Sequence, residues 1–401
     1  MSRPMYVSVR DIQRDPDQTA VYNLKTDKHF VVEGSAGSGK SSLALLFLQR
    51  ILADRGEDDD DPTQIYYITT SHELVECVRQ QFEFFDTPPR FNDYAITGGA
   101  DGMWGRGAIS DLQRKMQDPR GPYYISSRRC MLEPYDRNGF QNERIRINKH
   151  PNYLLIDEAQ DFKRAAIEDF LASATSGCVF YGDDTQKIMG FADPMSLSDI
   201  ELLLKAKFGE TDSQGKIVVY KYRLKRNWRL SREIAAFAQA LPNGVADPML
   251  LERSRGEYRE KPILKQVDPA DLIQYIKARA ISATTDDDTG IILRTNDEVK
   301  VFYDALRGMG NVSARYSISP DSRDYRYLQN TPVKIMTYEN AKGQQFRDVY
   351  LLADKVNALA KEELNRFYVG VTRAERFLRI LYSGNKPAFL ANVDPDLYIE
   401  E

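Results

Sequence analysis

Cysteine and histidine are both scarce in this chain of 401 residues, with three of each. Cys77, Cys130 and Cys178 are far apart and odd in number, so we interpret them as reduced packing residues. So few histidines exclude a His-rich metal site. No apolar run approaches the roughly 20 residues of a membrane span, and the N-terminus has no apolar stretch of signal-peptide length. We therefore expect a cytoplasmic protein without a membrane partner.

The chain also lacks an overall positive charge, because its formal net charge is −4. Two acidic runs, at residues 57–61 and 286–288, lie beside proline or glycine and are interpreted as solvated loops. Basic residues nevertheless cluster in one short segment: Lys221, Arg223, Lys225, Arg226, Arg229 and Arg232. Local charge, rather than net charge, must therefore decide whether a nucleic acid is the partner.

The remaining composition, 42% hydrophobic and 28% charged, is typical of a globular protein, and the length favours two domains. Short apolar strands alternate with amphipathic helices in two series, which predicts parallel sheets covered on both faces. The expected strands are 30–32, 65–69, 153–156, 178–181 and 217–220, then 263–267, 291–293, 333–336, 349–352 and 377–381. The expected helices include 41–53, 74–85, 269–281, 296–309 and 361–371.

The chain is expected to divide into an α/β domain over residues 1–222 and a second over residues 223–401. Residues 95–150 break the alternation, since they are rich in glycine, proline and arginine. We interpret this stretch as an irregular insertion into the first domain.

Residues 34–41 read GSAGSGKS and stand between an apolar strand and an apolar helix, the context that a phosphate-binding loop requires. Glycines let backbone N–H groups converge on phosphates, and the helix N-terminus favours their negative charge. Lys40 is expected to reach the β and γ phosphates and Ser41 to bind Mg²⁺. The predicted ATP-binding residues here are Gly34, Ser35, Ala36, Gly37, Ser38, Gly39, Lys40, Ser41 and Ser42.

A second apolar strand, residues 153–156, ends in two carboxylates. Asp157 fits a Mg²⁺ ligand, because ligands of open α/β sheets bind at the carboxyl ends of the strands. Glu158 fits the general base that orients water. Together with the phosphate loop, this pair predicts ATP hydrolysis.

Five further segments, in chain order, resemble motifs of superfamily 1 helicases of the UvrD/Rep type: LLIDEAQD, YGDDTQKIMGF, RNWRLSREI, VKIMTYENAKGQQF and NRFYVGVTRAERFL. The resemblance extends from Gln18 to about Ala374. It implies two RecA-like P-loop domains, each a mostly parallel sheet flanked by helices, with ATP in the cleft between them.

By this resemblance, Gln18 reads the adenine edge and Trp228 stacks on adenine. Gln186 couples the γ-phosphate to DNA contact. Arg229 and Arg373 match two arginines that approach the γ-phosphate from the second domain, where they stabilise charge in the transition state.

The resemblance also implies that single-stranded DNA lies across both domains. Phe191 corresponds to an aromatic side chain that stacks on bases. Thr69, Thr70, Thr337 and Lys342 are the candidates for contacts with the nucleic-acid backbone.

Several departures from the family pattern alter the activity that we expect of this chain. Glu339 stands where the family has histidine, and Gln345 stands where a glutamate contacts the ribose. The stretch between Ala238 and Val333 is too short for the family's large accessory domain, and the hairpin that splits the duplex is missing after LRILYSG. We therefore expect a reduced motor, an ATP-dependent 3′→5′ translocase on single-stranded DNA that acts in DNA repair or anti-phage defence. A nuclease or sensor subunit would be its protein partner.

Two other readings of the same residues stay open. The chain could be a regulatory ATP switch that controls a nuclease or defence complex with little translocation. A nucleotide kinase of the same loop class would need an acceptor site and a lid, for which the sequence gives no signal.

Overall fold

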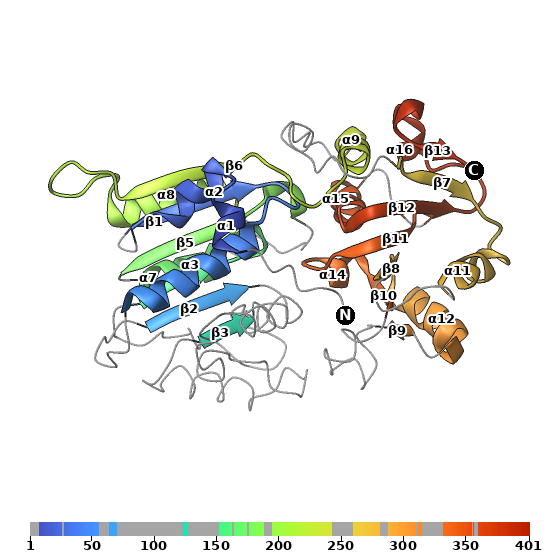
Figure 1. Cartoon of the computed structure of the whole chain (residues 1–401), viewed down its shortest axis with the longest axis horizontal. Coiled ribbons are helices and arrows are strands. Elements are labelled where there is room, and N and C mark those ends of the chain that lie inside the picture. Colours follow the sequence, from blue (N-terminus) through green and yellow to red (C-terminus); the bar gives the residue numbers. More distant parts are fainter. Residues whose placement is uncertain are drawn as a thin grey trace.

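Two parallel β-sheets flanked by helices lie side by side in the computed structural model (Figure 1). The structure describes residues 8–25, 28–55, 64–69, 123–126, 152–162, 164–174, 176–187, 195–242, 260–280, 288–309, 312–314, 332–354, 356 and 360–401. Within these ranges the first sheet has six strands in the order β3-β2-β4-β5-β1-β6, and the second has seven in the order β13-β7-β12-β11-β8-β10-β9. The expected α/β class with two parallel sheets is confirmed.

The first sheet is formed by β1 (His29–Gly34), β2 (Gln64–Thr69), β3 (Tyr123–Ser126), β4 (Asn152–Ile156), β5 (Gly177–Gly182) and β6 (Val219–Leu224). Its helices are α1 (Val9–Ile12), α2 (Pro16–Tyr22), α3 (Lys40–Arg55), α7 (Arg164–Ser173) and α8 (Leu197–Phe208). Two short 3-10 turns, Ala159–Asp161 and Asp184–Gln186, follow β4 and β5.

Side chains on the strands of the first sheet alternate between two apolar cores, because successive residues of a strand face opposite sides of the sheet. On β1, Val31 joins the core beneath α7 and α8. Its neighbours Phe30 and Val32 join the core beneath α3. Both faces are thus buried, which explains why these strands are continuously apolar.

The second sheet comprises β7 (Ile263–Gln266), β8 (Thr289–Leu293), β9 (Val312–Ala314), β10 (Val333–Thr337), β11 (Phe346–Leu352), β12 (Ala374–Tyr382) and β13 (Ile399–Glu400). Its helices are α9 (Arg232–Ala240), α11 (Leu272–Ala280), α12 (Asn296–Leu306), α14 (Tyr338–Ala341), α15 (Lys361–Val371) and α16 (Ala388–Ala391), with 3-10 turns at Arg307–Met309 and Pro395–Leu397.

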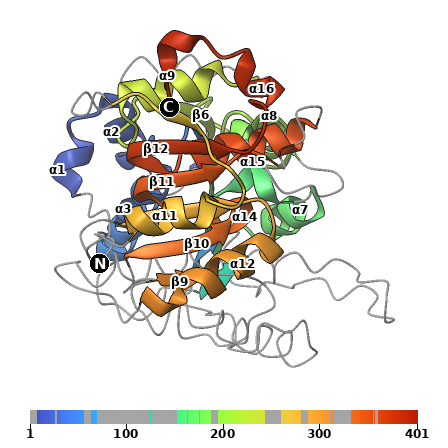
Figure 2. The same cartoon turned by 90° about the vertical axis from the view of Figure 1, so that its right-hand side faces the viewer.

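The second sheet repeats the two-faced burial. Ile292 and Met336 join the core shared with α9, α14 and α15, whereas Ile291 and Ile335 join the core shared with α11 and α12. Figure 2, seen from the side of the second sheet, shows α11 and α12 lying over the strands.

Strand β6 corrects one expected element. It was predicted at residues 217–220, but it begins at Val219 and continues to Leu224 in parallel register with β1. Ile217 instead forms an antiparallel bridge with Thr211, in a turn where the Asp212 side chain accepts hydrogen bonds from two backbone N–H groups. The strand therefore crosses the expected boundary at residue 222, and we propose that the first domain includes Leu224.

The stretch expected as an irregular insertion also contains a regular element. Residues Tyr123–Ser126 form β3, which pairs in parallel with β2 and thus belongs to the first sheet. Tyrosine and isoleucine favour strands, but four residues among many glycines and arginines give too weak a periodic signal. The rest of the stretch at 95–150, like the expected helix at 74–85, lies outside the described residues.

Candidate active site

The phosphate loop connects the end of β1 to the start of α3, as its sequence predicted. Gly37 and Gly39 adopt positive φ angles of 79° and 84°, a region that side chains with a Cβ rarely enter. The Lys40 ammonium group is buried and donates hydrogen bonds to the carbonyls of Gly34 (2.7 Å) and Ser35 (3.1 Å). The loop is therefore a closed turn with its lysine folded over the backbone.

Gln18 lies against this loop, although 20 residues separate it from Ser38. Its helix α2 begins at a cap in which the Asp15 carboxylate accepts from the Asp17 and Gln18 N–H groups. The Gln18 side-chain amide donates to the Ser38 carbonyl at 2.8 Å. A hydrogen bond to the phosphate loop thus holds Gln18, the residue expected to read the adenine edge.

Asp157 lies fully buried at the carboxyl end of β4. Its Oδ2 accepts a hydrogen bond from the Tyr67 hydroxyl at 2.8 Å, and the nearby Ser41 side chain acts to lower its pKa. Burial, together with the neighbouring charge of Glu158, raises the pKa of Asp157 to about 6. The two expected Mg²⁺ ligands, Ser41 and Asp157, therefore lie close together.

Glu158 has an unusual backbone, with φ 55° and ψ 43°, and is the only non-glycine residue with positive φ among the described residues. This left-handed conformation costs about 1–3 kcal/mol, so the surrounding contacts must hold it. The Gln160 amide donates to Glu158 Oε2 at 2.7 Å. Burial opposes ionisation, but Lys342, Lys40 and Gln160 lower the pKa of Glu158 to about 2. The carboxylate expected to orient water is thus kept ionised.

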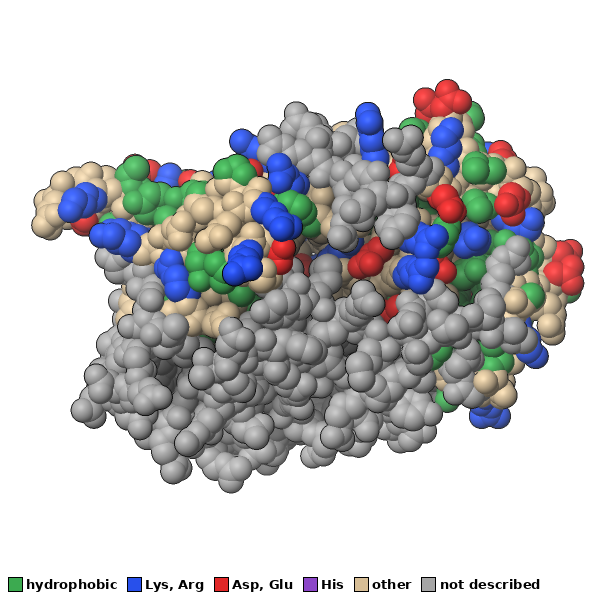
Figure 3. Space-filling model, viewed as in Figure 1, with side chains coloured by type: hydrophobic (Ala, Val, Ile, Leu, Met, Phe, Trp, Pro, Cys, Tyr) green, Lys and Arg blue, Asp and Glu red, His purple; other side chains and the backbone are tan. Residues whose placement is uncertain are grey.

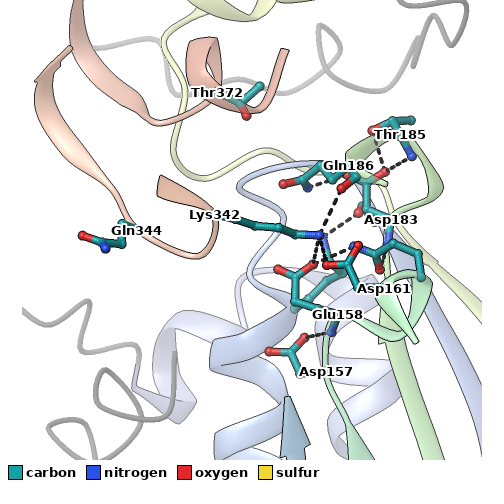
Figure 4. A network of polar contacts seen from close by, with 12 residues as sticks. Asp157, Glu158, Asp161, Asp183, Thr185, Gln186, Lys342, Gln344 and Thr372 are labelled. Carbon is teal, nitrogen blue, oxygen red and sulfur yellow. Dashed lines mark hydrogen bonds and ion pairs between the residues drawn. The ribbon is translucent and has the colours of Figure 1, made fainter. Parts of the chain in front are cut away.

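Lys342, on the loop after α14, reaches from the second sheet into this group of carboxylates (Figure 4). Its ammonium group forms an ion pair with Asp161, lies 3.4 Å from Glu158 Oε2 and donates to the Gln186 carbonyl at 3.0 Å. The side chain is buried, with 4% exposure. Predicted to contact a nucleic-acid backbone, Lys342 instead lies beside the expected general base.

Arg373 makes a second connection between the sheets, from the turn between α15 and β12. Its guanidinium group donates to Gln186 Oε1 at 2.8 Å, and Gln186 in turn donates to Asp183 at 2.6 Å. Arg373 is only 2% exposed. The structure thus brings the predicted residues Gln186 and Arg373 into direct contact.

Arg229 lies in the segment that joins β6 to α9. Burial, with the positive charge of Arg373, lowers its pKa to about 9, so it stays charged at neutral pH. The neighbouring Trp228 is half-buried, its indole N–H donates to Asp15 at 3.1 Å, and the Arg226 guanidinium lies over its ring. Both predicted residues therefore lie near the phosphate loop.

The residues around the loop can be tested against ATP and Mg²⁺. Ser35 and Ser38 have buried hydroxyl oxygens with no hydrogen-bond partner among the described residues. Such groups are costly to bury unless a ligand satisfies them. With the two glycines at positive φ and the proximity of Ser41 to Asp157, the site fits a phosphate chain and a hard divalent cation. The described residues contain no cluster of three or more acidic, histidine or cysteine side chains arranged for a metal ion.

Residues 332–381 match the family model for the UvrD-like helicase C-terminal domain. The predicted resemblance to UvrD-like helicases is confirmed. A "Probable DNA helicase" of Mycoplasma pneumoniae (strain ATCC 29342 / M129 / Subtype 1) is 23% identical over 275 residues, which cover 62% of this chain and 46% of the relative. The chain thus spans about half the length of that relative.

Two solved structures are also similar. The C-terminal domain of a possible DNA helicase from Lactobacillus plantarum WCFS1 is 19% identical, with a TM-score of 0.33, covering 43% of this chain and 98% of that domain. Arterivirus nonstructural protein 10, a helicase, is 13% identical, with a TM-score of 0.46, covering 98% of this chain and 66% of its own.

The nucleic-acid residues predicted from the UvrD-like motifs are only partly described. Thr70 and Phe191 lie outside the described residues, as does the side chain of Thr69 at the end of β2. Thr337 is buried and caps α14, where its hydroxyl accepts from the Asn340 N–H. These contacts therefore stay predictions.

The basic segment that the sequence singled out does not form a continuous positive surface. Lys221 lies near both Glu33 and Glu201, and Arg223 lies near Glu33, at distances of 3.6 to 3.8 Å. On the face in Figure 3, Lys and Arg side chains are interspersed with acidic and apolar ones.

The two departures from the UvrD-like pattern lie at different places in the second sheet. Glu339, on α14, forms ion pairs with Arg366 at 2.9 Å and Arg294 at 3.9 Å. Gln345 is half-buried and precedes β11. Glu339 is thus neutralised by neighbours within its own sheet.

Four functional contacts were missed from the sequence: those of Tyr67, Gln160, Asp161 and Asn227. Gln160 and Asp161 belong to the LLIDEAQD segment, so their position after the catalytic pair was an available signal. Tyr67 had none, because only the pairing of β2 with β4 brings it beside Asp157. Asn227 lies in the connection after β6 and contacts the loop at Ala36, 191 residues away in the sequence.

No helix within the described ranges is both long and apolar enough to cross a membrane.

Proposed function

We propose that the chain is an ATP-dependent translocase on single-stranded DNA that moves 3′→5′. One observation carries this proposal: Lys342 and Arg373 of the second sheet contact Glu158 and Gln186 of the first. A site shared in this way ties the state of the phosphates to the relative position of the sheets. Two units so coupled can move a strand that lies across both.

ATP and Mg²⁺ are the proposed cofactors. The loop at residues 34–42 would hold the phosphates, Gln18 and Trp228 the adenine, and Gln345 the ribose. Ser41 and Asp157 would bind Mg²⁺, which supplies charge neutralisation at the phosphates when bound. Glu158 would orient the attacking water, since it stays ionised and is held by Gln160.

The two arginines would stabilise the charge that develops during hydrolysis. Arg373 donates to Gln186, so a change at the phosphate would reach the second sheet through one hydrogen bond. We propose DNA repair or anti-phage defence in the cytoplasm as the setting, with a nuclease or sensor subunit as partner.

The decisive experiment is steady-state ATPase with and without single-stranded DNA, with Lys40→Ala beside the wild type. A motor predicts strong stimulation by DNA and loss of hydrolysis in the variant. Hydrolysis without stimulation would favour the regulatory switch, for which the internal pairing of Glu339 is the supporting observation. Full turnover by Lys40→Ala would overturn the site assignment.

Direction and unwinding need separate assays. Displacement of streptavidin from oligonucleotides biotinylated at one end reports direction, and the proposal expects displacement from the 5′ end only. On a 3′-tailed duplex the chain alone is expected to unwind poorly. Robust unwinding without a partner would contradict the reduced-motor interpretation.

A further inference from the structure

The segment at residues 225–230, between β6 and α9, is attached to the phosphate loop by one side-chain and one backbone hydrogen bond. Asn227 is 1% exposed, and its amide donates to the Ala36 carbonyl at 2.8 Å. The next residue adds a backbone bond, from the Trp228 N–H to the Gly37 carbonyl at 2.8 Å. The loop is thus hydrogen-bonded to a segment nearly 200 residues away in the sequence.

The other end of the Asn227 side chain holds the residues that follow it. Its Oδ1 accepts from the Arg229 N–H at 2.9 Å and from the Leu230 N–H at 3.0 Å. One buried amide therefore uses both its donor and its acceptor, the donor on the loop and the acceptor on the backbone that carries Arg229.

The loop and this segment are also in close steric contact. A Cβ at Gly37 would lie 2.6 Å from Asn227 Oδ1 and 2.7 Å from Arg229 Cβ, nearer than side chains tolerate. The absent side chain at Gly37 thus lets Arg229 approach the loop backbone, in addition to permitting its positive φ.

Leu230, directly after Arg229, already belongs to the core of the second sheet, together with Ile234 and Phe237 of α9. Arg229 therefore lies at the junction of the two sheets. Asn227 joins its backbone to the phosphate loop of the first sheet, and the next residue, Leu230, packs in the core of the second. Arg373 differs, because its turn connects two elements of the second sheet, α15 and β12.

We propose that Asn227 is a positioning residue that fastens Arg229 to the phosphate loop. Arg229 then keeps a constant place relative to bound ATP, and Arg373 alone changes its distance to the phosphates when the sheets move relative to one another. This inference rests on the proposed ATP hydrolysis and revises the expectation that both arginines approach from the second domain.

A double-mutant cycle tests whether Asn227 acts through Arg229. Basal kcat and the Kd of a fluorescent ATP analogue are measured without DNA for wild type, Asn227→Ala, Arg229→Ala and the double variant. Misplacing a catalytic group can cost about 10²-fold, so Asn227→Ala should lower kcat by that order with little change in Kd. In the Arg229→Ala background the further loss should be within about twofold. An equal loss in both backgrounds would overturn the proposal.

Asn365→Ala is the matched control for the cycle. Asn365 is also buried and donates one hydrogen bond between the sheets, to the Lys187 carbonyl at 3.1 Å. Any effect it has on kcat should be additive with Arg229→Ala. Should Asn227→Ala fail to fold, judged by circular dichroism, the isosteric Asn227→Asp keeps the acceptor and replaces the donor to Ala36 with a carboxylate oxygen.

A second measurement needs neither nucleotide nor hydrolysis. The chain has two tryptophans, so Trp104→Phe leaves Trp228 as the only one. Acrylamide quenching of Trp228 should increase in Asn227→Ala, because the segment then loses one of its two hydrogen bonds to the loop. Unchanged quenching in a folded variant would contradict the proposal. If quenching increases but the wild type hydrolyses no ATP, the proposed function fails and the attachment by Asn227 stands.

Discussion

The two sheets contribute to the candidate site through different kinds of contact. The first presents a loop whose groups are held by hydrogen bonds to backbone carbonyls, from Lys40, Gln18 and Asn227. The second reaches the same place with buried cations, Lys342 and Arg373. Contacts to a loop's own backbone fix one geometry, whereas charged side chains can exchange partners when a nearby charge changes. The difference suggests a rigid binding half and a responsive half.

Removing the arginines tests this contrast most strongly. Arg373→Ala and Arg229→Ala should each lower kcat by about 10³-fold or more, because each loses transition-state charge stabilisation. Steady-state kinetics with single-stranded DNA should separate them. DNA should no longer stimulate the ATPase activity of Arg373→Ala. In Arg229→Ala the ratio of activity with DNA to activity without it should be retained. Equal loss of stimulation in both would remove the distinction between the two halves.

Lys342→Met examines the responsive half alone. The variant removes the buried cation that pairs with Asp161 and lies beside Glu158, which should destabilise the chain by about 3–5 kcal/mol and lower kcat. Lys334→Met is the control, since Lys334 is paired with Asp288 inside the second sheet and has no contact with the site residues above. Urea unfolding should show losses in both variants, but only Lys342→Met should lose ATPase activity beyond what its unfolded fraction explains.

Tyr67→Phe examines the rigid half. It removes the hydroxyl that donates to Asp157 Oδ2, and loss of such a partner of a metal-binding carboxylate should weaken metal affinity by about 10- to 100-fold. Mn²⁺ binding in the presence of ATP, followed by electron paramagnetic resonance, measures this directly. Tyr181→Phe is matched, because Tyr181 is buried in the same core and its hydroxyl has no hydrogen-bond partner among the described residues. Equal affinities for the two variants would mean that Tyr67 has only a packing role.

Glu339→Gln should have the smallest effect. Its pairs with Arg366 and Arg294 are partly exposed, and such pairs contribute about 0–1 kcal/mol, so the free energy of unfolding should hardly change. DNA affinity at low salt should likewise change little, since the negative charge is already neutralised. A large gain in affinity would indicate that Glu339 faces the nucleic acid.

Local patterns predicted much of this molecule. The phosphate loop, the strand before Asp157 and most of the second-sheet strands follow from apolar periodicity and the positions of glycine. The family resemblance supplied Gln186 and Arg373, which no local pattern would have joined. Element ends were weaker, as β6 illustrates, because a turn that contains Ile217 looks apolar in sequence.

What escaped prediction depends on contacts between distant segments. The bond from Tyr67 to Asp157 follows from strand pairing, and the attachment of Asn227 to Ala36 from the path of a connection. Lys342 was predicted from its motif, but its burial beside two carboxylates was not expected, because that burial depends on the contact between the two sheets. A single sequence does not show which distant segments are in contact.

The position of the joining segment has a mechanical consequence. If the sheets rotate relative to one another about residues 225–230, displacement grows with distance from that pivot. Arg229 adjoins the loop and would hardly travel, whereas β9, an edge strand of the second sheet, would move farther (Figure 1). A small angular change at the phosphates would thus be amplified toward β9, as by a lever whose short arm is the nucleotide site.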